Sequence, residues 1–176
     1  MRWDGTVEDW LETLGAGTPD ELPATATAAI RSLLEYWNER RGSRDMPRRS
    51  DFDPMDVPRH LPGLLLIDVE GVRPDGIGIY RYRVVGGNEV ANRGHNPTGR
   101  LVEDGFYAAS LEEALAHYDA VRTSRRPLYA RVTFLDERER PVHEDTILVP
   151  FSEDGTTVTQ ILVYSEKLPW EERSSL

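Results

Sequence analysis

The stretch Met46–Asp68, MPRRSDFDPMDVPRHLPGLLLID, contains a polar turn, one helical turn and a buried strand in immediate succession. Asp53 can cap a helical turn that begins at Pro54, because proline lacks only an N–H group that the first turn leaves unpaired. This turn must end before Pro62, which cannot continue a helix. Leu64–Ile67 then gives four apolar residues in a row, too few for a helix and typical of a strand covered on both faces. We therefore expect the rest of the chain to pack on this strand.

The composition limits the class of protein. The chain has 176 residues, of which 39% are hydrophobic, and this is sufficient for one domain with a real core. Its net charge of -10 opposes general binding to nucleic acid or to anionic membranes. The N-terminus lacks the basic start and apolar core of a signal peptide, and no apolar run approaches the ~20 residues that span a bilayer. We expect a cytoplasmic protein that binds neither nucleic acid nor membrane.

Two helices are predicted before the quoted stretch. Thr6 and Asp9 approximate a capping box, and the apolar residues after them have the spacing of one helical face up to Gly15. We expect residues 1–23 to form a short amphipathic helix and a loop, with the helix either on the main domain or at a contact with another chain. A longer helix is predicted from about Thr25 to Arg41. Its apolar stripe consists of Ala26, Ile30, Leu33, Leu34 and Trp37.

A β-hairpin is predicted directly after the buried strand. Arg73–Gly76 is a turn signal, so a strand at about Ile77–Val85 should pair with the buried strand in antiparallel orientation. The alternation of side chains in this strand places Tyr80, Tyr82 and Val84 on one face. We expect this face to point into the interior.

The second half of the chain predicts one long helix and a three-stranded meander. Ser110 and Glu113 form a capping box for a helix that should end near Ser124. The predicted strands are Leu128–Leu135, Val142–Phe151 and Val158–Tyr164. The expected domain therefore spans residues 24–165 with its leading helix, and residues 166–176 form a polar tail. This order of elements predicts an α+β domain with a five-stranded antiparallel sheet and its helices on one face.

Several short motifs along the chain carry a family resemblance. They are Trp37 with Arg41-Gly42, Pro47–Asp51, Asp53-Pro54, Leu61-Pro62, Asp68-Val69, Tyr82–Gly86 and Thr98–Arg100. Together with the order of elements, these motifs resemble a bacterial family of stand-alone PAS domains that was long classed as a domain of unknown function. The resemblance covers about Ala28–Tyr164. It implies a PAS fold with strand order 2-1-5-4-3, which cups a small ligand under its helices, and it implies no catalytic residues.

The residues limit what such a domain could sense. PAS relatives sense light through a flavin or a thiol-linked chromophore, gases through haem, and metabolites in a bare pocket. The chain has no cysteine, so a flavin–cysteine adduct and a thiol-linked chromophore are both excluded. His117 lies on the helix that supplies the haem ligand in gas-sensing relatives, but at the edge of its apolar stripe. His143 and Asp145 can share a strand face but supply only two metal ligands. We therefore expect no cofactor and no metal.

A ligand pocket is the remaining candidate site. If the sheet curves over the long helix, the apolar lining would be Tyr80, Tyr82, Tyr118, Phe134 and Leu148. The candidate polar contacts are Asn88, Arg93, His95, Arg131 and Thr146. The alternative is that the aromatic side chains fill the core and leave no ligand cavity.

These observations favour a sensor over an enzyme. The sequence contains no nucleophile elbow and no glycine-rich phosphate loop. We expect a non-enzymatic sensor or adaptor that binds a small organic ligand or a partner protein and signals in trans. The alternative is a structural protein-interaction module with a filled core. Because PAS domains often dimerise through helices that precede the first strand, we also expect a homodimer through the helix Thr25–Trp37, with Ile30, Leu33 and Trp37 near the contact.

Overall fold

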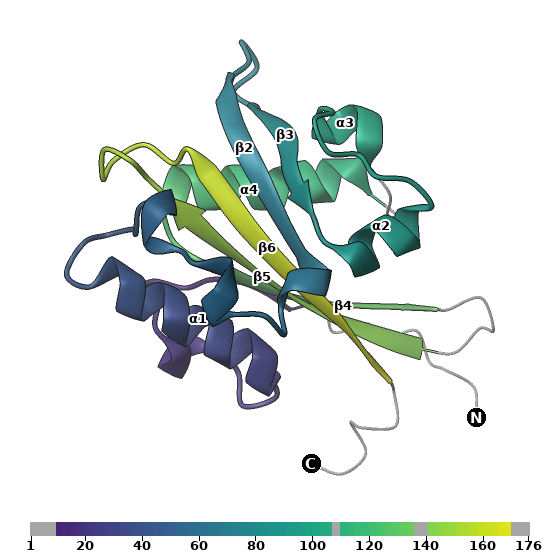
Figure 1. The fold of residues 1–176 in the computed structure, drawn as a ribbon, viewed down its shortest axis with the longest axis horizontal. Coiled ribbons are helices and arrows are strands. Elements are labelled where there is room, and N and C mark those ends of the chain that lie inside the picture. The colour runs from purple at the N-terminus through teal and green to yellow at the C-terminus, as the bar shows by residue number, and fades with distance from the viewer. Residues whose placement is uncertain (1–9, 107–109, 136–140, 170–176) are drawn as a thin grey trace.

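The structure, a computed structural model, describes residues 10–106, 110–135 and 141–169. Its centre is an antiparallel sheet of six strands in the order β1-β4-β5-β6-β2-β3 (Figure 1). The strands are β1 (Trp10–Thr13), β2 (Leu64–Val72), β3 (Gly78–Val85), β4 (Leu128–Leu135), β5 (Pro141–Phe151) and β6 (Gln160–Pro169). When the five strands after β1 are numbered from one to five, their order is 2-1-5-4-3, as predicted.

The helices lie on the two faces of this sheet (Figure 1). α4 (Leu111–Ser124) covers one face, and the short helices α2 (Gly87–Arg93) and α3 (Val102–Gly105) follow β3 on the same side. α1 (Ala28–Arg41) precedes the five-stranded core and packs against β5 on the opposite face. Within the described residues, no helix is both long and apolar enough to cross a membrane.

The predicted N-terminal helix is wrong for the residues that the structure describes. Trp10–Thr13 forms the edge strand β1, which pairs with β4 from Trp10↔Arg131 to Thr13↔Leu128. This pairing supplies backbone partners to the outer edge of β4, a long-range contact that outweighs the local helical spacing. Leu14, directly after the strand, is fully buried and joins the core, whereas Leu11 is 58% exposed. The expected capping box lies outside the described residues.

α1 buries its apolar stripe inside the chain. Thr27 caps the helix by accepting a hydrogen bond from the Ile30 N–H group. The side chains of Ile30, Leu33 and Trp37 are at most 2% exposed, and Trp37 Nε1 donates to the carbonyl of Pro150 at 2.8 Å. The chain's own sheet covers these three side chains, so they are not exposed to a partner. The homodimer itself stays a prediction.

The quoted stretch folds as its residues predict. The Asp53 side chain accepts a hydrogen bond from the Met55 N–H group at 2.9 Å and caps the 3-10 turn η3 (Pro54–Asp56). A second 3-10 turn, η4 (Leu61–Gly63), leads into β2, whose first four residues are buried. β2 lies between β3 and β6 in the sheet.

The hairpin of β2 and β3 contains a register shift that changes one predicted orientation. Leu66 pairs with Val84 and Ile67 pairs with Tyr82, so Arg83 is an extra residue in β3. Such an extra residue interrupts the alternation of side chains between the two faces. Tyr82 is 1% exposed, as predicted for an interior position, but Val84 is 51% exposed. The prediction of an interior Val84 is therefore wrong.

Candidate functional site

Three predicted site residues form an aromatic cluster between β3 and α4. Tyr80, Tyr82 and Tyr118 are at most 6% exposed, and the ring centroids of Tyr80 and Tyr118 are 5.2 Å apart. Leu148, from the predicted apolar lining, is also buried, at 1% exposed. The cluster fills the space between the sheet and α4, as the filled-core alternative expects.

The Tyr80 hydroxyl ties α4 to the β2–β3 hairpin. It donates to Oδ1 of Asp119 at 2.6 Å, and the same oxygen accepts from the Gly78 N–H group at 2.9 Å and from Arg122 Nε at 3.0 Å. Burial raises the pKa of Tyr80, and the Asp119 carboxylate raises it further. The hydroxyl therefore remains a donor at neutral pH, and the network has a structural role.

Arg93 connects α2 to the aromatic cluster. Its guanidinium lies 5.7 Å from the centroid of the Tyr82 ring and forms an ion pair with Glu89, with Nη1 and Oε2 2.5 Å apart. The side chains of Arg93 and Glu89 are only 6% and 14% exposed. A group that binds Glu89 in place of Arg93 would therefore disturb the contact of Arg93 with the buried Tyr82 ring.

Arg131 lies on the opposite face of the sheet from the tyrosines. Its Nε and Nη2 atoms donate to the two carboxylate oxygens of Asp145 at 2.5 and 2.7 Å, and Nη2 also donates to the carbonyl of Thr25 at 2.9 Å. Consecutive side chains of β4 alternate between the faces, so Arg131 points towards the segment that leads into α1 and away from the tyrosines. Its contact with a ligand stays a prediction.

The other predicted polar contacts do not converge on one point. His95 is exposed on the loop after α2, with Nδ1 3.0 Å from the carbonyl oxygen of Arg93. Thr146 lies in β5, and its hydroxyl is 2.8 Å from that of Ser165 in β6. The side chain of Phe134 lies outside the described residues. Asn88, at the start of α2, is the predicted contact that reaches a cavity.

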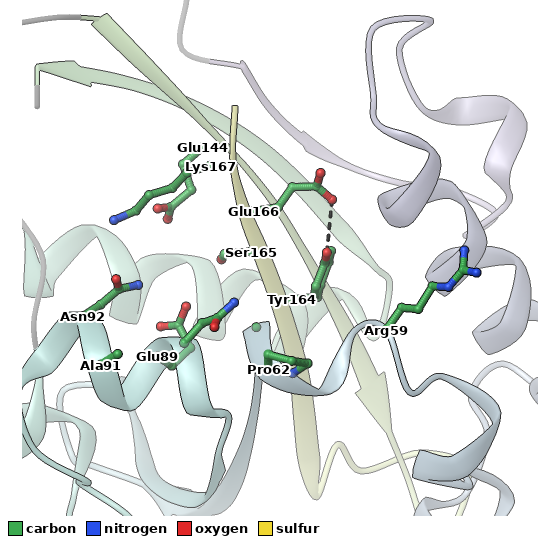
Figure 2. Close-up of a pocket in the computed structure, with 12 residues that line it drawn as sticks. Arg59, Pro62, Glu89, Ala91, Asn92, Glu144, Tyr164, Ser165, Glu166 and Lys167 are labelled. Atoms are coloured by element: carbon green, nitrogen blue, oxygen red, sulfur yellow. Dashed lines mark hydrogen bonds between the residues drawn. The ribbon is translucent and has the colours of Figure 1, made fainter. Parts of the chain in front are cut away.

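This cavity, of about 410 Å³, lies where β6 runs past the beginning of β2 (Figure 2). β6 pairs with β2 only as far as Leu64↔Tyr164 but continues along β5 to Val142↔Pro169. Beyond Tyr164, β6 therefore faces η4 and α2 in place of a strand. The polar lining residues are Arg59, Asn88, Glu89, Asn92, Glu144, Tyr164, Ser165, Glu166 and Lys167. The predicted polar tail from residue 166 thus begins inside β6 and at the wall of this cavity.

Glu144 is a half-buried charged residue of the cavity wall. Burial raises the pKa of its carboxyl group, the nearby Glu89 carboxylate raises it further, and the cations of Lys167 and Arg93 lower it by smaller amounts. In Figure 2, Glu144 projects from the strands, while Glu89 and Asn92 project from α2 towards them. The sequence analysis missed Glu144, although strand alternation places it on the same face as Thr146 and Leu148.

Two other charged residues of the lining have different surroundings. Oε2 of Glu166 accepts hydrogen bonds from the hydroxyl groups of Tyr164 at 3.1 Å and Thr27 at 3.0 Å, which connects this wall to the start of α1 (Figure 2). Arg59 points away from the side chains of α2 in the same view. The charges that face each other across the cavity are therefore those of Glu89, Glu144 and Lys167.

The residues considered for metal and haem binding can be placed among the described residues. No group of three or more His, Cys, Asp or Glu side chains is placed to hold a metal ion in residues 10–106, 110–135 and 141–169. His117 is half-buried on α4, and burial lowers its pKa although Glu113 opposes the effect.

A family model described as a PAS domain matches residues 25–164. The chain belongs to the PAS domain family. Domains of this family are generally sensory and bind ligands or partner proteins. The match extends from the segment before α1 to the middle of β6, so it includes most of the cavity wall.

Comparison with solved structures found light-oxygen-voltage domains. One, studied with a flavin analogue, is 8% identical with a TM-score of 0.47, over 69% of this chain and 87% of that chain. An RNA-binding light-oxygen-voltage receptor is 14% identical with a TM-score of 0.45, over 96% of this chain and 40% of that chain. A light-oxygen-voltage protein of Rhodobacter sphaeroides is 14% identical with a TM-score of 0.40, over 60% and 58% of the two chains. No curated protein matched the sequence.

Proposed function

We propose that this PAS domain is a non-enzymatic sensor or adaptor that binds a small organic ligand in the cavity between α2 and the ends of β5 and β6. The observation that carries the proposal is the cavity of about 410 Å³ into which Glu144, with its raised pKa, projects. Small-molecule sites are typically ~300–1,000 Å³, and perturbed titratable groups cluster at functional sites. The proposed output is a signal to a partner protein in trans, in a cytoplasmic setting.

The contacts of Glu89 offer a route from the cavity to the core. Glu89 lines the cavity and pairs with Arg93, whose guanidinium lies over Tyr82. A ligand that binds Glu89 would compete with Arg93 and so favour a different position of α2 relative to β3. This differential contact is what a ligand needs in order to shift a conformational equilibrium.

A ligand screen with a blocking variant tests the proposal. Native mass spectrometry of the purified protein and a thermal-shift screen of metabolites should find a compound that stabilises the fold, by about 2.7 kcal/mol at 100 times its Kd. The substitution Ala91→Trp fills the cavity wall and should abolish this response. Ala28→Trp, at an exposed position of α1, is the matched control and should retain it. A full response in Ala91→Trp would place the ligand elsewhere.

The second candidate is a structural interaction module without a ligand. The close packing of Tyr80, Tyr82 and Tyr118 favours it, because the interior under α4 is already filled. A protein that is purified without any bound compound and is indifferent to the whole screen would support the module. We propose a homodimer for either candidate, and a monomer in light scattering at high concentration would contradict this.

A further inference from the structure

We infer that the ligand of the cavity is an organic cation with a primary ammonium group, held between the carboxylates of Glu144 and Glu89. The inference rests on the proposed function, because it names the ligand class of the same site.

Two carboxylates reach the cavity from separate elements. Glu144 comes from β5 and Glu89 from α2, and the two project towards each other (Figure 2). Burial and the Glu89 carboxylate that faces it raise the pKa of Glu144, whereas Lys167, its neighbour across β5 and β6, and Arg93 lower it. A bound cation would offset this repulsion, whereas a bound anion would meet both carboxylates.

The cations near these carboxylates do not reverse the preference for a cationic ligand. Arg93 lies one helical turn after Glu89 on the same face of α2, pairs with it and lies over the Tyr82 ring; the residues that line the cavity do not include it. Lys167 is at the wall beside Glu144, and Arg59 points away from α2 (Figure 2). A bound anion could therefore contact the cation of Lys167, but it would be repelled by the carboxylates of Glu144 and Glu89.

The neutral groups suit an ammonium head group with an alkyl chain. An ammonium ion has three donors and no acceptor. Glu144 and Glu89 can accept two of these hydrogen bonds, and the side-chain oxygens of Asn88, Asn92 or Ser165 can accept the third. The volume of about 410 Å³ leaves room for several methylene groups beyond the head group, and Pro62 and Ala91 provide apolar wall for them.

A series of three probes of one length and different charge tests the inference. The probes are 1,4-diaminobutane, 1,4-butanediol and succinate, each titrated against the full chain by calorimetry and thermal shift at neutral pH. The expected result is binding of the diamine alone. Equal binding of the diol, preferential binding of succinate, or no binding of the diamine would each overturn the inference.

A pair of variants locates the diamine. Glu144→Gln should weaken diamine binding by roughly tenfold or more, the effect of losing one charge-assisted hydrogen bond. Glu35→Gln, at an exposed position of α1, should leave it unchanged. Equal affinities in the two variants would overturn the inference. If the diamine fails but another compound stabilises the protein and Ala91→Trp abolishes that response, the inference is wrong and the proposed function stands; if no compound acts, the proposed function fails as well.

Discussion

Glu144 and Asp145 are neighbours in β5, yet the fold places their carboxylates in opposite situations. Asp145 points towards α1, is fully buried and forms two hydrogen bonds with Arg131. Glu144 points towards α2 and lines a cavity, where it faces the Glu89 carboxylate and has Lys167 as its neighbour across the strand pair. Strand alternation alone separates the two side chains. A buried carboxylate with a full set of partners is part of the structure, whereas one that faces a like charge at a cavity is available to a ligand.

The largest effect is expected from breaking the pair on the α1 face. Asp145→Leu or Arg131→Met alone should destabilise the domain by about 3–5 kcal/mol, because each leaves one uncompensated buried charge. The double variant Arg131→Met/Asp145→Leu should recover most of this loss, because both charges are then absent. Urea unfolding measures all three. A single variant that loses less than about 1 kcal/mol would show that the pair is solvated and the contrast with Glu144 false.

An intermediate effect is expected at the aromatic cluster on the other face. Tyr80→Phe removes one donor from Asp119, which keeps those of Gly78 and Arg122, and should cost about 1–3 kcal/mol. Tyr36→Phe, which removes the exposed hydrogen bonds that the hydroxyl donates to Asp56 and accepts from the Asp53 N–H group, is the matched control and should cost less. Equal losses of unfolding free energy in the two variants would contradict a structural network at Tyr80.

The smallest effect on the free energy of unfolding is expected at Glu144, where substitution should stabilise the protein. Glu144→Gln should stabilise the unliganded protein at neutral pH by about 1 kcal/mol or less, because it removes a carboxylate that burial and Glu89 disfavour. The pKa of Glu144 in the folded state lies above its ordinary value of 4.5, so its contribution to stability is complete below pH 4.5 and is lost as the pH rises through the folded-state pKa.

Thermal unfolding between pH 4 and pH 8 measures this difference. The advantage of Glu144→Gln over the natural protein should be absent near pH 4 and should grow to a plateau as the pH rises. The control Glu35→Gln, at an exposed position of α1, should unfold like the natural protein at pH 8. A natural protein that is more stable than Glu144→Gln at pH 8 would mean that Glu144 already has a compensating partner.

The core of the fold was predictable from local signals. The caps at Asp53 and Ser110 are where the sequence predicted them, and the strand order follows from the sequence of elements and the family resemblance. Tyr80 and Tyr82 have the expected burial because their alternation is local. Val84 does not, since the register shift depends on the partner strand.

The features that could not be predicted depend on pairing between strands that are far apart in the sequence. The strand at Trp10–Thr13 exists because β4 has an open edge, and no local pattern reports that. The cavity exists because β2 begins at Leu64 while β6 continues beyond Tyr164, a difference in length between paired strands. The face on which Arg131 lies could not be derived from the sequence alone, because it depends on the register of β4 in the sheet. Glu144 could have been predicted, because strand alternation places it on the same face of β5 as Thr146.

Mapping the backbone amide shifts tests the central claim most directly, with the most stabilising compound of the screen added to isotope-labelled protein. The account predicts that the largest changes occur at Asn88–Asn92, at Glu144 and at Ser165–Lys167. Smaller changes should occur at Arg93 and at Tyr82, which Arg93 contacts. Changes confined to Tyr80, Tyr118 and the rest of α4, with none at the cavity, would contradict it by placing the ligand in the aromatic core.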